Sequence, residues 1–372
     1  MRVLAVNAGS SSLKLRLLDG DDELDGSHDL ALEHGEIDDE ELRAALVGLD
    51  RADAVGHRIV HGGRRYLGPV RIDDRVVAAL RELTDLAPLH QPKSLAALHA
   101  VTRALPGVPA VACFDTAFHA TLPAAAATYA LPAAWRERWD LRRYGFHGLS
   151  HAYASRRAAE LTGAARIITC HLGAGASLAA VRDGRSIDTT MGFTPLDGLV
   201  MATRPGSIDP GLLLWLLEHG EMSESEMGEA LEHDAGLTGL AGSDDMREIL
   251  ARAHADEPQA RLALDVYLHR LRAGIAAMAA ALGGVETIVF TGGVGERAPA
   301  IRAHALAGLE FLGVRIDAAQ NKAAEDDAEI TGPDSSSRVL VIAAREDLEI
   351  ARQVRQVMRS GASSRYAGED HE

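Results

Sequence analysis

The chain contains little cysteine and no long hydrophobic run. Its only two cysteines, Cys113 and Cys170, lie within apolar, strand-like runs, which indicates buried reduced thiols more than a disulfide or a metal pair. No apolar run approaches the roughly 20 residues that span a bilayer, and the N-terminus begins with a strand pattern in place of a basic, apolar signal segment. We therefore expect a cytoplasmic protein without a membrane-spanning segment.

The chain is also poor in lysine, because only Lys14, Lys93 and Lys322 occur among its 38 basic residues. None of them follows a glycine, so the G-x-x-x-x-G-K-[ST] phosphate loop is absent and a nucleotide would need another architecture. The net charge of −16 disfavours nucleic acid and anionic membranes as partners, since both bind a cationic face. An anionic substrate would need a local basic pocket.

The sequence does contain one strand–turn–strand pattern in two copies, over Val3–Gly20 and Ile167–Gly184. Each copy has an apolar run, a turn of small residues, a second apolar run and a final Asp-Gly, which is typical of a tight hairpin turn. Small residues let backbone N–H groups approach a phosphate closely. Such a duplicated unit is typical of the actin, sugar kinase and heat-shock ATPase superfamily, and a length of 372 residues fits about two domains.

The rest of the pattern alternates strands and helices, which predicts an α/β fold. The acidic stretch Asp19–Glu41 has few apolar residues and is expected to be loop and short helix. Thr291–Glu296 is expected to be a glycine loop, and the tail Ser360–Glu372 to be disordered. Strands are expected at Arg2–Val6, Leu13–Leu18, Ala54–Val60, Pro109–Phe114, Glu286–Phe290 and Val339–Ala344, a meander at Arg166–Thr190, and helices at Asp74–Leu86, Lys93–Leu105, Pro210–Leu231 and Pro258–Leu282.

Polar residues of the first hairpin form one candidate site. Leucines alternate with polar residues along its second strand, so Lys14 points the same way as Ser12, beside the turn. Asn7, Ser10, Ser12 and Lys14 either line a phosphate and metal site or belong to an ordinary solvated strand face.

Further motifs bring arginine, aspartate and histidine to strand ends and turns. Arg58, in GHRIVHGG, suits a carboxylate or phosphate because its guanidinium makes two parallel hydrogen bonds; a surface ion pair is the alternative. Asp115 follows an apolar strand, where α/β folds collect site residues, or it caps a helix. In RYGFHGLSH, His147 suits a phosphoryl oxygen, whereas His151 suits a buried structural role equally well. Arg204, in TRPGSIDPG, is a second candidate arginine.

Two motifs of the C-terminal part suit a nucleotide and its metal. FTGGVGE, at Phe290–Glu296, offers bare backbone on which an adenosine can lie. After the strand VLVIAA, Glu346 and Asp347 either bind magnesium, directly or through water, or favour the start of the last helix.

Across nearly its whole length the chain resembles the acetate kinases, with these motifs in the family's order: NAGSSSLK, GHRIVHGG, APLH, FDTAFH, RYGFHGLSH, CHLGAGAS, DTTMGFTPLDG, TRPGSIDPG, FTGGVGE and REDLEIAR. The resemblance implies two duplicated ribonuclease-H-like domains flanking a nucleotide cleft, with the expected limits 1–117 plus 349–372 and 118–348. It also implies a homodimer that makes acetyl phosphate and ADP from acetate and ATP, reversibly, with Mg²⁺ or Mn²⁺.

The resemblance assigns roles to individual residues. It implies metal ligands at Asn7 and Glu346, an essential aspartate at Asp115, a substrate-binding arginine at Arg58, and transition-state stabilisers at His147 and Arg204. Phosphates would contact Lys14, together with Ser10 and Ser12, and the nucleotide would contact His171, Leu172, Gly173, Ala174, Gly175, Asp245, Met246, Arg247, Gly293, Val294, Gly295, Glu296 and Arg297. A small acyl pocket would comprise Val60, Leu89, Phe146 and Pro195.

Several positions depart from the family's usual pattern. Ala174 stands where the family usually has Asn, Gln91 and Lys93 replace an Asn and a small residue, and Pro205–Ser207 replaces Cys-Gly-Asp. Similarly, Ala344–Asp347 replaces Thr-Asn-Glu-Glu. The alternatives are a propionate or butyrate kinase, an acyl kinase with another phosphoryl donor, and a non-catalytic, actin-like nucleotide-binding protein. The last is disfavoured because such a protein needs no carboxylate-binding arginine.

Overall fold

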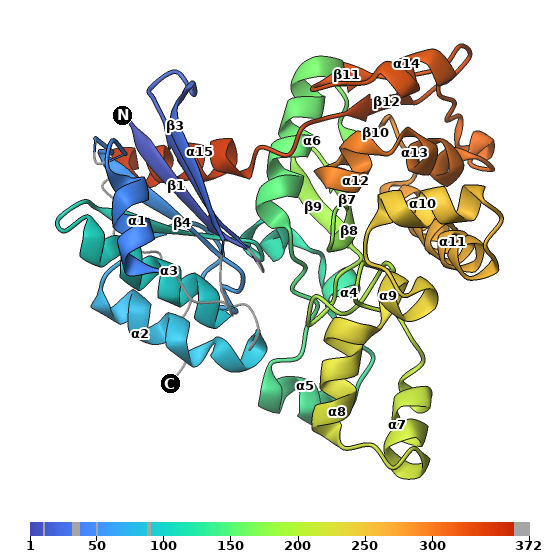
Figure 1. Cartoon of the computed structure of the whole chain (residues 1–372), viewed down its shortest axis with the longest axis horizontal. Coiled ribbons are helices and arrows are strands. Elements are labelled where there is room, and N and C mark those ends of the chain that lie inside the picture. Colours follow the sequence, from blue (N-terminus) through green and yellow to red (C-terminus); the bar gives the residue numbers. More distant parts are fainter. Residues whose placement is uncertain (10–11, 32–37, 50, 88–90, 361–372) are drawn as a thin grey trace. The chain divides into compact units, whose positions relative to one another are not determined.

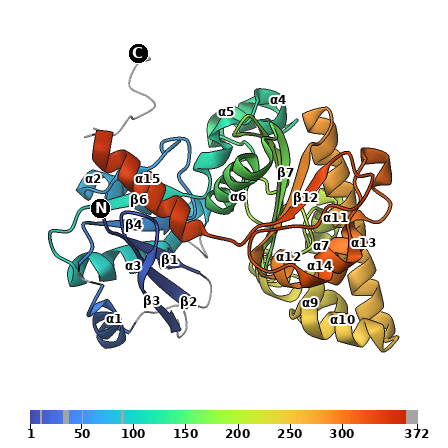
Figure 2. The same cartoon turned by 90° about the horizontal axis from the view of Figure 1, so that it is seen from above.

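The structure is a computed structural model that describes residues 1–9, 12–31, 38–49, 51–87 and 91–360. The chain divides into two compact units (Figures 1 and 2). Unit 1 consists of Met1–Ala120, Phe146–Tyr153 and the segment from Arg345 onward, and unit 2 of Thr121–Gly145 and Ala154–Ala344. The domain limits expected from the sequence stay a prediction.

Unit 1 contains a six-stranded mixed sheet in the order β3-β2-β1-β4-β6-β5. β1, β2 and β3 pair antiparallel, β1, β4 and β6 pair in parallel, and β5 pairs antiparallel with β6. The strands are β1 (Val3–Ala8), β2 (Ser12–Leu18), β3 (Leu24–Ala31), β4 (Ala54–Ile59), β5 (Val70–Arg71) and β6 (Ala110–Phe114).

Unit 2 contains a second six-stranded sheet in the order β9-β8-β7-β10-β12-β11. β7, β8 and β9 pair antiparallel, β7, β10 and β12 pair in parallel, and β11 pairs antiparallel with β12. Strand order and direction therefore repeat those of unit 1, which confirms the predicted α/β fold with two similar halves. The strands are β7 (Arg166–Leu172), β8 (Ala176–Arg182), β9 (Arg185–Thr189), β10 (Thr287–Thr291), β11 (Ala328–Glu329) and β12 (Arg338–Val341).

Helices cover both faces of the sheet in unit 1 (Figure 2). On β1, Leu4 and Val6 pack with helices α1 and α3, whereas Val3 and Ala5 pack with α15. This explains why β1 is apolar from Val3 to Val6, before Asn7, as expected of a strand buried on both faces. Gly56 of β4 allows the close approach of α15, because a Cβ atom there would lie 2.3 Å from Ile350 Cγ2. The helices of unit 1 are α1 (Asp39–Leu46), α2 (Asp74–Glu82), α3 (Gln91–Ala104) and α15 (Glu346–Ser360), with a 3₁₀ turn at Thr84–Leu86.

The long helix α11 (Pro258–Leu282) packs against β8 of unit 2. Helix α6 (Gly148–Thr162) begins in unit 1 and continues into unit 2, and so does the 3₁₀ segment Ala117–Thr121. Unit 2 further contains α4 (Ala124–Ala127), α5 (Ala133–Trp139), α7 (Pro210–His219), α8 (Glu224–Glu229), a π-helical turn (Ala230–Asp234), α9 (Gly236–Ala241), α10 (Met246–His254), α12 (Gly292–Arg297), α13 (Pro299–Leu306), a 3₁₀ turn (Glu310–Leu312) and α14 (Ala318–Ala323). No helix among the described residues is long and apolar enough to cross a membrane.

Most expected elements are confirmed, including the helix Pro258–Leu282 and the tight turn between β8 and β9, where Asp183 and Gly184 both have positive φ. Both cysteines are buried free thiols, as predicted. The expectation of loop and short helix over Asp19–Glu41 is wrong in part, because β3 lies there. As an edge strand, β3 is held by its backbone pairing with β2 and buries only Leu30, so it has no apolar alternation. The expected glycine loop is instead the short helix α12.

Candidate active site

Four candidate residues of unit 1 come together at the carboxyl edge of its parallel strands. Asn7 lies near the end of β1, Arg58 near the end of β4 and Asp115 directly after β6. Because these strands run in parallel, their carboxyl ends meet at one edge of the sheet, where α/β folds bind ligands. Glu346 is the first residue of α15 and completes the group.

Hydrogen bonds link these four side chains into one network. Arg58 contacts Asp115 at two points, from Nη2 to Oδ2 at 2.7 Å and from Nε to Oδ1 at 3.2 Å. Arg58 Nη1 donates to Asn7 Oδ1 at 3.0 Å, and Asn7 Nδ2 donates to Glu346 Oε2 at 2.7 Å. Arg58 Nη1 also lies 3.8 Å from Glu346 Oε2. Each member therefore restricts the position of the next.

Burial strengthens the electrostatic coupling in this network. The side chain of Asp115 is 1% exposed and that of Arg58 is 16% exposed. Burial raises the pKa of Asp115, and the Arg58 guanidinium opposes that shift. Burial acts to lower the pKa of Arg58, but the carboxylates of Asp115 and Glu346 outweigh it and raise that pKa. The guanidinium stays protonated and is available to an anionic ligand.

The residues predicted on the first hairpin lie beside this network. Lys14 of β2 is paired in register with Asn7 of β1, so the two side chains are cross-strand neighbours on one face of the sheet. Lys14 is exposed and Ser12 is half-buried. The position of the Lys14 ammonium next to Asn7 fits the predicted contact with phosphate. Ser10 lies outside the described residues.

Gly148, in the RYGFHGLSH motif, packs against the turn that carries Asp115 within unit 1. The Gly148 N–H donates to the Asp115 carbonyl at 3.0 Å, and a Cβ atom at Gly148 would lie only 2.0 Å from that oxygen. His147, directly before it, has a φ of 55° and is half-buried. His151 is fully buried and its ring lies edge-on to His119, in agreement with the structural alternative given for His151.

The residues predicted for the acyl pocket are divided between the two units. Val60 follows β4 two residues after Arg58, and Phe146 is buried beside His61 with ring centroids 5.6 Å apart. Pro195 is buried in unit 2, and Leu89 lies outside the described residues.

The predicted magnesium site offers few protein ligands. Among the described residues, no group of three or more His, Cys, Asp or Glu side chains could hold a metal ion. Mg²⁺ usually keeps several waters and binds one or two carboxylates together with substrate phosphates. Glu346, with Asn7 beside it and Lys14 nearby for phosphate, fits such a sparse site.

In unit 2, the first predicted nucleotide residues form the turn between β7 and β8. His171 and Leu172 end β7, and the turn closes with a hydrogen bond from the Gly173 N–H to the Gly175 carbonyl at 2.9 Å. Ala174 is exposed at the tip of this turn. The turn therefore presents backbone groups and no polar side chain at this position.

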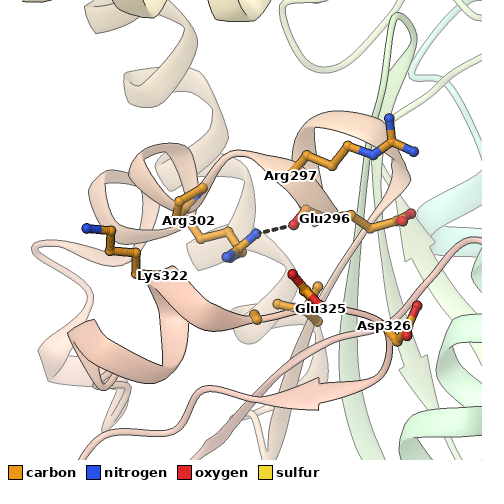
Figure 3. Close-up of a pocket in the computed structure, with 9 residues that line it drawn as sticks. Glu296, Arg297, Arg302, Lys322, Glu325 and Asp326 are labelled. Atoms are coloured by element: carbon orange, nitrogen blue, oxygen red, sulfur yellow. Dashed lines mark hydrogen bonds between the residues drawn. The ribbon is translucent and has the colours of Figure 1, made fainter.

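The other glycine segment of unit 2 is helix α12, which follows β10 and borders a cavity of about 370 Å³ (Figure 3). Glu296 Oε1 accepts from the backbone N–H groups of Gly292 and Ala344 at 2.9 and 3.0 Å. Arg302 is 1% exposed and its Nη1 donates to the carbonyls of Gly295 and Glu296 at 2.9 and 2.7 Å. These contacts fix both ends of the segment Gly292–Glu296. The predicted nucleotide residues Gly293 and Val294 lie within this segment, and Arg297 follows it.

The remaining predicted residues of unit 2 form ion pairs. Arg204 Nε lies 2.7 Å from Glu232 Oε2, and both side chains are largely buried. Arg247 makes a two-point contact with Asp245, the N-cap of α10, and this contact lowers the pKa of Asp245 to about 2. Met246, between them, is buried.

Two residues that contact the predicted site were missed by sequence reasoning. Glu232 lies 28 positions from Arg204, and Arg302 follows the glycine segment within α13. Neither belongs to a short motif whose spacing points to chemistry, so only the fold shows their contacts.

The chain is similar to known proteins over nearly its whole length. The sequence profile of a family described as the acetokinase family matches residues 27–352. An acetate kinase from Thermosipho melanesiensis is 43% identical over 400 residues, covering 97% of this chain and 98% of the relative. The crystal structure of Porphyromonas gingivalis acetate kinase is 35% identical with a TM-score of 0.87, covering 96% of this chain and 99% of that one. A propionate kinase structure from Francisella tularensis is 36% identical with a TM-score of 0.88, covering 95% and 98%. The predicted resemblance is thereby confirmed.

Proposed function

This chain belongs to the acetokinase family, and we propose that it transfers the γ-phosphoryl group of ATP to acetate, giving acetyl phosphate and ADP. The transfer is direct, in line and reversible in this proposal. Acetate is already an anion, so the reaction needs a group that holds a carboxylate and charges that stabilise the transferring phosphoryl oxygens.

The network around Arg58 is the observation that carries this proposal. A guanidinium held at two points by Asp115 and at a third by Asn7 is fixed in direction before a ligand binds. We assign Arg58 to binding the acetate carboxylate. Since acetate needs no deprotonation and the Asp115 oxygens accept from Arg58, we assign Asp115 to orienting Arg58 rather than to general base catalysis.

Magnesium would supply charge neutralisation at the ATP phosphates when bound. We assign Glu346 and Asn7 to holding it, with Mn²⁺ as a substitute. Glu346 suits this role because its carboxylate lies at the start of α15 and is itself positioned by Asn7 Nδ2. Lys14, the cross-strand neighbour of Asn7, is assigned to the phosphates, together with Ser10 and Ser12.

We assign Arg204 and His147 to stabilising the negative charge of the phosphoryl group in the transition state. The ion pair of Arg204 with Glu232 supports a positioned guanidinium. The nucleotide is assigned to the β7–β8 turn, to Asp245–Arg247 and to α12, where the contacts of Arg302 and Glu296 favour a rigid backbone. We propose ATP as the phosphoryl donor because the chain belongs to this family. If the enzyme uses another phosphoryl donor, Ala174 in the β7–β8 turn is the position that would accommodate it.

Propionate is a second candidate acceptor, because the chain is as similar to a propionate kinase structure as to an acetate kinase structure. Val60 and Phe146 leave the wall of the acyl pocket apolar, and one methylene is worth about 1–3 kcal/mol in such a pocket. We therefore propose acetate as the main substrate and propionate as an accepted one, with butyrate disfavoured.

We propose further that the protein is a cytoplasmic homodimer. Helix α7 has no buried residue, and Leu214 and Trp215 are 68% and 56% exposed. A large apolar surface on one helix is typical of an interface. Its proposed partner is a second copy of this chain, which sedimentation or light scattering would detect.

Trapping of acyl phosphate as its hydroxamate tests the main proposal. Purified protein is incubated with ATP and Mg²⁺ and with acetate, propionate or butyrate at equal concentration. Product with acetate or propionate supports the proposal and ranks the acids by kcat/KM. No product from folded protein that still binds ATP would contradict it and favour another donor or a non-catalytic role.

A further inference from the structure

A buried glutamine clamps the backbone next to the proposed acyl pocket. Gln91 is the first residue of α3 and is fully buried. Its Oε1 accepts from the His61 N–H at 3.3 Å, and its Nε2 donates to the carbonyls of His61 and Leu80, at 3.3 and 3.2 Å. One N–H and two carbonyls admit a single orientation of the amide, and only an amide supplies both donors and an acceptor.

The clamped residue, His61, is fixed on its side-chain face as well. Its Nδ1 accepts from the Gly63 N–H at 2.8 Å, and its ring lies edge-on to Phe146 with centroids 5.6 Å apart. Burial lowers the pKa of His61 to about 4, so the ring is neutral and Nδ1 can accept at neutral pH. The backbone amide, the carbonyl and the ring of one residue are thus all held.

His61 connects two residues assigned to the acyl pocket. Val60 precedes it in the chain, and Phe146 packs against its ring. A shift of the His61 backbone therefore moves Val60 covalently and changes the support of Phe146. Because protein interiors are close-packed, a shift of His61 displaces the neighbouring side chains that form the pocket wall.

We propose that Gln91 is a positioning residue that sets the acyl-chain preference, by holding the Val60–His61 backbone at the distance that admits acetate. This inference rests on the proposed function. Gln91 touches neither substrate nor nucleotide in this proposal and acts only through Val60 and His61. Its loss widens the acyl pocket, lowers kcat/KM for acetate and raises the relative use of longer acids.

The test compares two variants of Gln91 with a matched control. Gln91→Met keeps the length of the side chain and removes all three hydrogen bonds, and Gln91→Asn keeps the amide on a stem one methylene shorter. Gln353→Met changes another buried glutamine of unit 1, whose Nε2 donates to Glu349. For each protein, kcat and KM are measured with acetate, propionate and butyrate and with ATP, and folding is checked by thermal melting.

Gln91→Met is expected to raise the propionate-to-acetate ratio of kcat/KM by roughly 3- to 10-fold, part of the 10- to 200-fold that one methylene is worth in a tight pocket. Gln91→Asn keeps an amide and carries the residue usual in the acetate kinases, so it should raise the ratio less. The KM for ATP should stay within about twofold, and Gln353→Met should lower the melting temperature without moving the ratio. If Gln91→Met folds and keeps the wild-type ratio, the inference is overturned. If Gln91→Met does not fold, equal ratios in Gln91→Asn and in the wild type overturn it. If the wild-type protein phosphorylates none of the three acids, the proposed function fails instead.

Discussion

The guanidinium of Arg58 is held by Asp115 at two points, with Nη2 to Oδ2 at 2.7 Å, and the Asp115 side chain is 1% exposed. A buried ion pair of this kind fixes the orientation of the guanidinium as well as its charge, because the planar guanidinium and the carboxylate align only in one plane. The orientation of Arg58 therefore depends on a residue that binds no substrate in the proposed mechanism.

Replacing Asp115 with Asn is expected to reduce kcat/KM for acetate by about 100-fold or more, because removing one partner of a buried, hydrogen-bonded charge pair costs about 2–5 kcal/mol. The loss should appear with acetate and propionate alike, since both carboxylates bind the same guanidinium. Steady-state kinetics with hydroxamate detection measures it.

The control is Asp29→Asn, which removes the partner of Arg16 at a surface where Asp29 is 55% exposed. Exposed pairs contribute little, so this variant should retain wild-type kinetics. Equal losses in the two variants would show that Asp115 has no special role.

Glu346→Gln is expected to raise the Mg²⁺ concentration for half-maximal activity about tenfold, the scale on which altered metal-site partners reduce affinity. Glutamine can still accept from Asn7 Nδ2, so the local fold is kept while the negative charge is lost. Titration of activity with Mg²⁺ at saturating ATP measures the effect. Glu160→Gln, at an exposed position on α6, is the control, and an unchanged Mg²⁺ dependence in Glu346→Gln would remove Glu346 from the metal site.

Arg204→Ala is expected to lower kcat by about 10³-fold, the lower range for an arginine that acts on a phosphoryl transition state. The Kd for ATP, measured by calorimetry, should change far less, because this charge acts mainly on the transferring group. Glu232→Gln keeps the arginine and removes only its ionic partner, so its kcat should fall less. Near wild-type turnover in Arg204→Ala would contradict the assignment.

The fold could be predicted largely from sequence because its central strands are apolar and its hairpins repeat. The failures have physical causes. The edge strand β3 is specified by backbone pairing with β2 and not by apolar side chains. The glycines of α12 predict a loop, but hydrogen bonds from Arg302 and to Glu296 stabilise a short helix there.

For the candidate site, sequence motifs predicted Asn7, Arg58, Asp115 and Glu346 but not the bonds between them. Each lies at the end or start of a different element, and their proximity follows from parallel strand order. Gln91 has no chemical signature of its own, since its role comes from two backbone groups of His61 that only the fold brings near.

Three fully buried histidines predict a pH dependence of stability. Burial lowers the pKa of His57 to about 3 and those of His61 and His119 to about 4. The unfolded chain takes up a proton at each near pH 6.5, whereas the folded protein does not. Stability is therefore fully present above pH 6.5 and is lost as the pH falls from there towards 4.

Each histidine is expected to remove about 1.4 kcal/mol of stability per pH unit within this window, and most carboxyl groups titrate below about pH 5. Melting temperatures measured between pH 7.5 and 5.5 should therefore fall steadily. The clearest variant is His57→Leu, because neither ring nitrogen of His57 has a hydrogen-bond partner among the described residues. It should flatten the curve, since it removes one of these proton linkages. A wild-type melting temperature that is constant down to pH 5.5 would mean that these histidines take up protons in the folded state.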